Sequence, residues 1–305
     1  MKVLVTGADG FVGSRLVPRL LAQGHQVLAA VRPVANRGTV DARAETVSLE
    51  LGDEASVRAV AERRPHAVIH LAAVSSGSEA RKHPMAAWEV NVVGTARLAE
   101  AMVDAAPVFL LVSTAEVYGA GAAVPRVETD PVAPCSAYAA SKLAAEIAAL
   151  EVFRRAKLPV IVARPFPHTG PGQDERFVVP AFVARLRLAQ EASAPAVRVG
   201  NLEPVREFMH VDDVVEAYTL LLARGRPGEV YNVASGQGIS LEDLFHRLCA
   251  LVGHRAIPEA HPSLIRPSEI PFLVGDSAKL RAATGWAPRW SLEQTLAEVV
   301  NAQAN

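Results

Sequence analysis

The sequence predicts an α/β fold in which a parallel β-sheet is doubly wound by helices on both faces, with a smaller lobe at the C-terminal end. Short apolar runs alternate with helical patterns through the first half of the 305 residues, as crossover connections between parallel strands require. A glycine-rich segment joins the first apolar run to the first helical pattern, and proline- and glycine-rich loops follow from about residue 164. These three observations place a sheet first and a second lobe after it.

The expected strands are short and apolar. Residues 2–6 and 26–31 are strand-like, and residues 11–23 between them carry apolar side chains at helical spacing. The next three strands are near-continuous apolar runs, which is typical of strands buried on both faces of a sheet. These runs are residues 67–71, 107–112 and 159–163.

The second half of the chain predicts a return to the sheet and then a separate lobe. Residues 211–222 are helix-like and residues 229–233 strand-like, and two further helices are expected near 240–252 and 291–303. The predicted boundaries are 1–165 plus about 207–236 for the sheet domain, and 166–206 and 237–305 for the smaller lobe.

Charge and composition exclude several kinds of partner. The formal net charge is −1 with a pI near 6.8, and no cluster of Lys and Arg favours nucleic acid or an anionic membrane. No apolar stretch reaches the ~18 residues of a membrane helix, and the N-terminal MKVLVTG enters a strand without a charged leader. We therefore expect a cytoplasmic protein that acts on a small molecule. Cys135 and Cys249 stand alone, so reduced thiols are expected and no metal site is predicted.

The segment TGADGFVG lies directly between the first strand and the first helix. Gly7 permits the tight turn, Gly10 lets the backbone approach a pyrophosphate, and Gly13 lets the helix pack close to the sheet. The N–H groups of Phe11 and Val12 face the phosphates at the start of the helix. The motif thus predicts a Rossmann-type dinucleotide site, the alternative being a purely structural glycine turn.

The end of the second strand indicates which dinucleotide is bound. Enzymes that use NAD usually carry Asp or Glu there for the ribose 2′-hydroxyl, whereas this chain has Arg32. A guanidinium can hold a 2′-phosphate that a carboxylate would repel. NADP(H) is therefore favoured over NAD(H), unless Arg32 is only a solvated loop residue.

Tyr138 and Lys142 stand four residues apart in the helix-favouring stretch SAYAASKLAAE, so both project from one face. An ammonium near a phenol lowers the pKa of the phenol and makes it a usable acid/base group. The pair alone is a weak signal. It becomes specific together with the glycine motif and with STAEVYG at 113–119, which follows a buried strand.

With these motifs the chain resembles the extended short-chain dehydrogenase/reductase family, which comprises nucleotide-sugar epimerases, dehydratases and reductases. Further matching segments are HLAA, NVVGT, RPF and REFMHVDDVV, so the resemblance spans essentially the whole chain. Within the family the chain is similar to the GDP-sugar branch, through the segments RPFPHTGPGQ, FVVPAF, GNLEPVREF and RPSEIPFLVGDSAKLRAATGW.

The resemblance implies roles for individual residues. Tyr138 would be the acid/base, Lys142 would hold the nicotinamide ribose and tune Tyr138, and Thr114 would bond the reacting sugar oxygen. Glu116 completes the expected catalytic set, and Glu50 would face the adenine amino group. Besides the glycine turn and Arg32, the remaining expected cofactor contacts are Leu51, Leu71, Ala72 and Ala73.

The same resemblance places the nucleotide-sugar mainly against the second half of the chain. Arg206 and Arg266 would contact the diphosphate and Glu269 the ribose, because cationic forks suit a dianionic ligand. His168 is expected as a hydrogen-bonding element rather than a second acid/base. The other expected substrate contacts are Ser75, Thr114, Val179 and Asn201.

Together these features predict a reductase in which NADPH gives hydride to the C4 ketone of a 4-keto-6-deoxy nucleotide-sugar, GDP-linked, while Tyr138 protonates the oxygen. The alternatives are a dehydratase or epimerase that retains NAD(P)+ and a non-catalytic NADP-sensing protein. Ala115 counts only against a dTDP-type dehydratase, so the choice of reductase depends on HTGPGQ and FVVPAF. The resemblance also implies a homodimer, formed through helices around 84–105 and 136–156.

Overall fold

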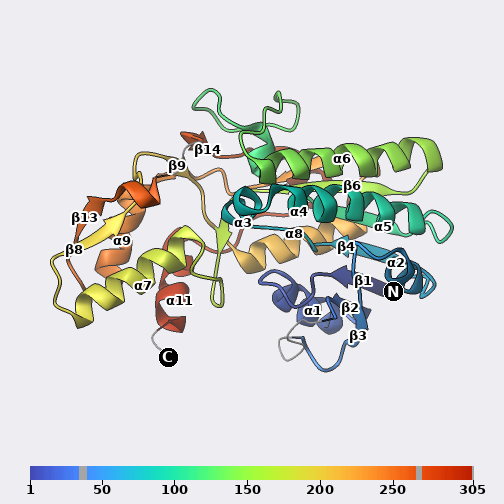
Figure 1. The fold of residues 1–305 in the computed structure, drawn as a ribbon, viewed down its shortest axis with the longest axis horizontal. Helices are drawn as coiled ribbons and strands as arrows, with labels where there is room; N and C mark the ends of the chain where they lie inside the picture. Colours follow the sequence, from blue (N-terminus) through green and yellow to red (C-terminus); the bar gives the residue numbers. More distant parts are fainter. Residues whose placement is uncertain (34–39, 266–269, 304–305) are drawn as a thin grey trace.

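The computed structural model describes residues 1–33, 40–265 and 270–303 and is built on a parallel sheet of seven strands (Figure 1). The spatial order is β11-β6-β5-β4-β1-β2-β3, and every neighbouring pair runs parallel. The predicted α/β fold with a doubly wound parallel sheet is thereby confirmed. The strands are β1 (Lys2–Thr6), β2 (Gln26–Val31), β3 (Glu45–Ser48), β4 (Ala67–His70), β5 (Val108–Val112), β6 (Val160–Pro165) and β11 (Val230–Val233).

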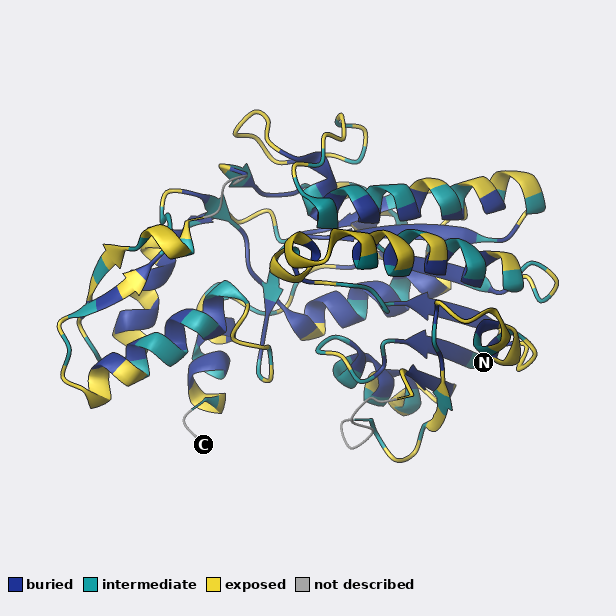
Figure 2. Ribbon diagram, viewed as in Figure 1, coloured by how far each residue is buried: buried dark blue, intermediate teal, exposed yellow. Residues whose placement is uncertain are grey.

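Helices cover both faces of the sheet, because successive side chains of a strand point to opposite sides and both sets are apolar here. Val3 and Val5 of β1 belong to the hydrophobic core on one face, and Leu4 belongs to the core on the other. The first face carries α1 (Gly13–Ala22), α8 (Val211–Arg224) and α10 (Ala278–Thr284); the second carries α2 (Glu54–Ala61), α5 (Thr95–Ala101) and α6 (Ala137–Ala156). Figure 2 shows the strands buried between these layers.

Four short helical segments connect the larger elements. They are α3 (Gly77–Lys82), α4 (Pro84–Trp88), the π-helix η2 (Glu89–Gly94) and the 3₁₀-helix η3 (Ala115–Tyr118). The π-helix continues directly from α4 into α5, so the three form one path along α6.

A second group of elements lies at the left of Figure 1 and has a hydrophobic core of its own. This core consists largely of α7 (Val178–Glu191), β8 (Ala196–Val199), α9 (Leu241–Val252) and α11 (Leu292–Ala302). Within this group, β8 pairs with β13 (Ile257–Ala260). Other short strands pair outside the main sheet: β9 (Val205–Arg206) with β12 (Ile239–Ser240) and β14 (Phe272–Leu273), and β7 (His168–Thr169) with β10 (Met209–His210). A 3₁₀ turn, η4 (Pro262–Leu264), follows β13. The predicted domain boundaries stay a prediction.

The start of the first helix differs from the prediction, and one strand was not predicted. The helix expected at 11–23 begins at Gly13, because Phe11 and Val12 belong to the preceding turn. No strand was expected at β3, which lies at the edge of the sheet with mostly exposed side chains and therefore lacks an apolar run. Within the described ranges, no helix combines the length and apolar character that crossing a membrane requires.

Candidate active site

The glycine turn between β1 and α1 is packed so tightly that two of its positions exclude a side chain. Gly7 has a φ of +66°, and a Cβ there would lie 3.0 Å from the Ala72 nitrogen. A Cβ on Gly13 would lie 2.3 Å from the Gly7 carbonyl oxygen. No side chain caps the start of α1, whose first turn carries no acidic residue. The backbone N–H groups of Phe11 and Val12 therefore form a candidate anion-binding site at the N-terminus of α1.

A buried hydroxyl fixes the end of β1 to the end of β4. Thr6 Oγ1 accepts from the backbone N–H groups of Leu71 and Ala72 at 3.1 and 3.0 Å, and it lies 2.7 Å from His70 Nδ1. Because the oxygen already accepts two N–H groups, its own proton is directed to Nδ1. His70 Nε2 then donates to Thr95 Oγ1 at 3.0 Å. Burial lowers the pKa of His70 to about 3, so the ring is neutral. This network was not predicted, although HLAA places His70 at the end of a buried strand.

The other expected cofactor contacts lie at the carboxyl ends of neighbouring strands, where parallel strands place their following loops together. Arg32 is exposed one residue after β2, next to residues outside the described part of the chain. Glu50 follows β3 and is half-buried; its Oε1 accepts from the Gly52 N–H at 3.4 Å. Leu51 is buried against Gly94, and Ala73 is half-buried in the segment after β4.

The helix α6 begins at Ser136, whose side chain accepts from the Ala139 N–H at 3.1 Å, and its alanine-rich sequence then runs for 20 residues. Tyr138 lies in its first turn and is half-buried. Lys142, one turn later, is buried, and its Nζ donates to the Val112 carbonyl oxygen at 2.5 Å. The end of β5 and the start of α6 therefore meet at this pair.

Thr114 and Glu116 complete this group. Thr114 hydrogen-bonds the Tyr138 side chain, and its Oγ1 accepts from the Glu116 N–H at 3.2 Å as the cap of η3. Thr114 is buried and Glu116 half-buried, and the charge of Glu116 acts on Tyr138. The structure thus brings together all four residues expected as catalytic. Their roles stay a prediction.

The pKa values of the pair differ from the expectation. Burial raises the pKa of Tyr138 above its usual value, the Glu116 carboxylate raises it further, and the Thr114 hydrogen bond lowers it only partly. Burial lowers the pKa of Lys142 to about 8, with the Glu146 carboxylate opposing this effect. The expected lowering of the Tyr138 pKa is therefore wrong for this arrangement, because desolvation of the phenol and the Glu116 carboxylate raise the pKa instead.

Residues expected to contact substrate have different surroundings. His168 stacks on Phe11 with ring centroids 6.3 Å apart, and its Nδ1 donates to the Phe166 carbonyl oxygen at 3.0 Å. Burial lowers the pKa of His168, which agrees with a neutral, hydrogen-bonding ring. The stack brings the glycine turn against the segment that follows β6. Val179, in contrast, is buried in the core of the second group of elements.

Asn201 lies in the loop that precedes β9 and Arg206 lies in β9 itself, and both are half-buried. Asn201 Oδ1 accepts from the Glu203 N–H at 3.1 Å, and Arg206 Nη1 donates to the Val205 carbonyl oxygen at 2.8 Å. Arg266 and Glu269 lie outside the described residues.

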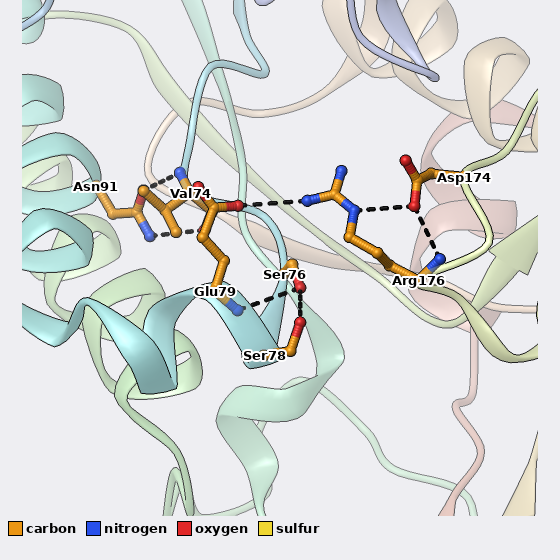
Figure 3. A network of polar contacts seen from close by, with 7 residues as sticks. All are labelled: Val74, Ser76, Ser78, Glu79, Asn91, Asp174 and Arg176. Carbon is orange, nitrogen blue, oxygen red and sulfur yellow. Dashed lines mark hydrogen bonds and ion pairs between the residues drawn. The ribbon is translucent and has the colours of Figure 1, made fainter. Parts of the chain in front are cut away.

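Ser75 is exposed between β4 and α3, and residues on either side of it in the chain make the polar contacts drawn in Figure 3. On one side, Asn91 of the π-helix accepts from the Val74 N–H at 2.8 Å and donates to Ser141 Oγ on α6 at 2.9 Å. On the other side, Arg176 reaches Glu79 at 3.4 Å and is itself held by Asp174 at 2.9 Å. The loop before α7 therefore contacts α3 through Arg176 and Glu79.

A buried carboxylate missed by the sequence analysis joins the second group of elements to the sheet. Glu207 is fully buried between β9 and β10, and its two oxygens accept from Ser235, Gly236 and Gly275. Burial raises the pKa of Glu207 to about 7. The segment REF signals this glutamate, but its partners lie some 28 to 68 residues away along the chain.

Comparisons with known proteins agree with this architecture. A model of the NAD dependent epimerase/dehydratase family matches residues 3–234. GDP-6-deoxy-D-mannose reductase from Pseudomonas aeruginosa is 34% identical over 98% of this chain and 96% of its own length. UDP-glucose 4-epimerase from Mycolicibacterium smegmatis is 33% identical, with 98% and 97% covered. The structure of RMD from Pseudomonas aeruginosa complexed with NADPH superimposes with a TM-score of 0.85 at 32% identity, covering 99% of this chain and 98% of that one.

The chain therefore belongs to the NAD dependent epimerase/dehydratase family, and the resemblance to extended short-chain dehydrogenases/reductases is confirmed. It is an enzyme that works with a nicotinamide dinucleotide.

Proposed function

We propose that this enzyme reduces the C4 ketone of a 4-keto-6-deoxy nucleotide-sugar with NADPH, and that the nucleotide is GDP. The observation that carries the proposal is the environment of Tyr138. Because its pKa is raised and its side chain bonds Thr114, the phenol enters the reaction protonated. A protonated phenol beside a hydroxyl suits a ketone whose oxygen gains negative charge during reduction.

The glycine turn fits the dinucleotide, since a side chain on Gly7 or Gly13 would displace the backbone that approaches the pyrophosphate. When bound, the nicotinamide supplies the hydride that forms the new C–H bond at C4. Thr114 orients the ketone oxygen, and the Tyr138 Oη proton passes to that oxygen as the carbonyl becomes a hydroxyl. The Lys142 ammonium holds the cofactor ribose and offsets the charge left on the phenolate.

The preference for NADPH is supported by the end of β2. Arg32 is exposed there, where a carboxylate would favour NAD. The similar structure of RMD contains NADPH, while the family as a whole is described as NAD dependent. A cationic side chain at this position favours the cofactor that carries the additional phosphate.

An epimerase that retains its cofactor is the second candidate, favoured by the 33% identity to UDP-glucose 4-epimerase. The reductase is preferred because GDP-6-deoxy-D-mannose reductase and RMD are both similar over nearly the whole chain. The expected segment HTGPGQ contributes β7, which contacts the glycine turn through the stack of His168 on Phe11, and FVVPAF contributes the start of α7.

A substrate panel tests the function. The purified enzyme is incubated with NADPH and, in turn, with GDP-, UDP- and dTDP-linked 4-keto-6-deoxy sugars, and the products are identified by NMR. We expect stoichiometric loss of NADPH and a new C4 hydroxyl with the GDP-linked ketone. Better use of a UDP- or dTDP-sugar would contradict the GDP assignment. In a separate incubation with GDP-mannose, conversion to the 4-keto sugar without net change in the redox state of the cofactor would support a dehydratase.

We also propose a homodimer. Met85 and Trp88 on α4, Val93 on the π-helix and Ile147 on α6 are all exposed large apolar side chains, and these elements pack side by side. Such a group of apolar side chains on neighbouring helices is typical of a surface that a second protein covers.

A further inference from the structure

A buried ion pair lies one helical turn beyond the Tyr138/Lys142 pair. Tyr138, Lys142 and Glu146 follow one another at four-residue intervals on α6, so their side chains share one face. Glu146 is 2% exposed. Its carboxylate accepts both prongs of the Arg164 guanidinium from β6, with Nε–Oε1 at 3.0 Å and Nη2–Oε2 at 2.7 Å. This geometry allows the carboxylate little freedom to turn.

The guanidinium is held in turn by a second aromatic residue. Arg164 lies over the ring of Tyr118 at 4.9 Å, and the Tyr118 hydroxyl donates to Asn232 Oδ1 on β11 at 2.7 Å. Burial acts to lower the pKa of Arg164, but Glu146 more than offsets this, so the guanidinium stays charged. Arg164 therefore fixes the position of Glu146 without ever exchanging a proton with it.

The negative charge of Glu146 stabilises the ammonium form of Lys142. That ammonium group is otherwise buried beside a neutral acceptor. Lys142 is 5% exposed, and its Nζ donates to the neutral Val112 carbonyl oxygen. The charge of Glu146 opposes the desolvation that lowers the Lys142 pKa to about 8. The charge of Lys142 contributes to the lowered pKa of His70 on β4, and the His70 ring is itself neutral. The charge of Glu116 on η3 acts on Tyr138 of α6.

We propose that Glu146 is a positioning residue of the proposed reaction: its carboxylate, fixed by Arg164, keeps Lys142 in the ammonium form that holds the cofactor ribose and adjoins Tyr138. The inference rests on the proposed function. A buried ion pair often contributes no more stability than apolar side chains of the same volume, so stability alone gives little reason for a charged pair at this place.

The test separates charge from packing. Glu146→Leu combined with Arg164→Met replaces the pair by apolar side chains, and circular dichroism and thermal unfolding check that the fold is kept. The affinity for the nicotinamide cofactor that the wild type binds more tightly is then measured from pH 7 to 10. A matched control is Glu151→Gln, which breaks an exposed pair with Arg155 on the same helix.

We expect wild-type and control affinities to fall as the pH rises through about 8, where Lys142 loses its proton. In the double variant this fall should move to lower pH by on the order of one unit, which is roughly a fivefold weaker affinity at pH 8 and approaches about tenfold at higher pH. The pH profile of turnover should move with it. If the double variant does not fold, Glu146→Gln alone is tested for the same displacement, and ¹³C-labelled lysine NMR follows Lys142 directly.

The inference would be overturned if a folded variant without the Glu146 charge showed the same pH dependence of cofactor affinity as the wild type. Glu146 would then contribute to packing alone. That result would leave the proposed function intact. Failure of the wild type to bind either NADPH or NADH would instead overturn the proposed function, and the inference with it.

Discussion

Among individual residues, Tyr138 has a role that one atom can test, because Tyr138→Phe removes only the phenol oxygen. The variant keeps the half-buried ring in place, so cofactor affinity should change little. Turnover should fall by the ~10² to 10⁴ that general acid catalysis contributes. Steady-state kinetics together with cofactor titration measure both quantities, and turnover near the wild-type value would remove Tyr138 from the mechanism.

Arg32 allows a test of the proposed cofactor preference at the same scale. Arg32→Ala removes a charge that would bond the 2′-phosphate, so NADPH affinity should fall roughly ten- to a hundredfold while NADH affinity hardly changes. Fluorescence titration with both cofactors measures the difference. Equal losses for the two, or a wild-type preference for NADH, would contradict the role given to Arg32.

Local patterns predicted which residues would meet, but not their environment. The four-residue spacing of Tyr138 and Lys142, with Thr114 after a buried strand, placed the three together correctly. The raised pKa of Tyr138 was not predicted, because it depends on burial in the folded chain. The Glu146–Arg164 pair also escaped prediction, since it joins a helix to a strand 18 residues away.

At the scale of elements, the turn from β1 to α1 depends on the lack of a side chain at Gly13. Gly13→Ala would place a Cβ 2.3 Å from the Gly7 oxygen, so the turn must shift. We expect a loss of about 1 to 3 kcal/mol in the free energy of unfolding, together with weaker cofactor binding. Chemical denaturation and cofactor titration measure the two effects.

Gly77→Ala is the matched control for this substitution. Gly77 begins α3, and a Cβ there would meet no atom within 4 Å. Its stability and cofactor affinity should therefore remain near the wild-type values. Similar behaviour of both variants would show that the close approach at Gly13 does not control the turn.

Element positions were predicted where burial leaves a sequence pattern. The apolar runs that became β4, β5 and β6 are buried on both faces, which explains why they were recognised. The edge strand β3 has no such pattern. The π-helix at Glu89–Gly94, which packs against α6, was not predicted either.

For the whole molecule, the apolar surface on α4, η2 and α6 predicts a dimer. Trp88→Glu combined with Ile147→Glu should produce monomers, because two charges in a buried interface would lack partners. Light scattering after size exclusion measures the mass. Leu188→Glu, at an exposed position on α7, should leave the dimer unchanged. A monomeric wild type would contradict the proposal.

The overall architecture could be predicted further than the substrate site could. Each buried parallel strand has its own apolar run in the sequence. The expected substrate contacts Ser75, His168 and Arg206 come instead from three separate loops or short strands. Their arrangement depends on contacts such as Phe11 with His168, which join distant segments. Val179 illustrates the limit, because it was expected as a substrate contact but is buried in a separate hydrophobic core.

The central claim is that the enzyme transfers hydride from NADPH to C4 and returns an oxidised cofactor. Its most direct test uses NADPH that carries deuterium at both positions on C4 of the nicotinamide, together with a GDP-linked 4-keto-6-deoxy sugar. The account predicts one deuterium on C4 of the product sugar and one NADP+ released for each product, both measured by NMR and mass spectrometry. Product formed without deuterium, or without net oxidation of the added cofactor, would contradict it.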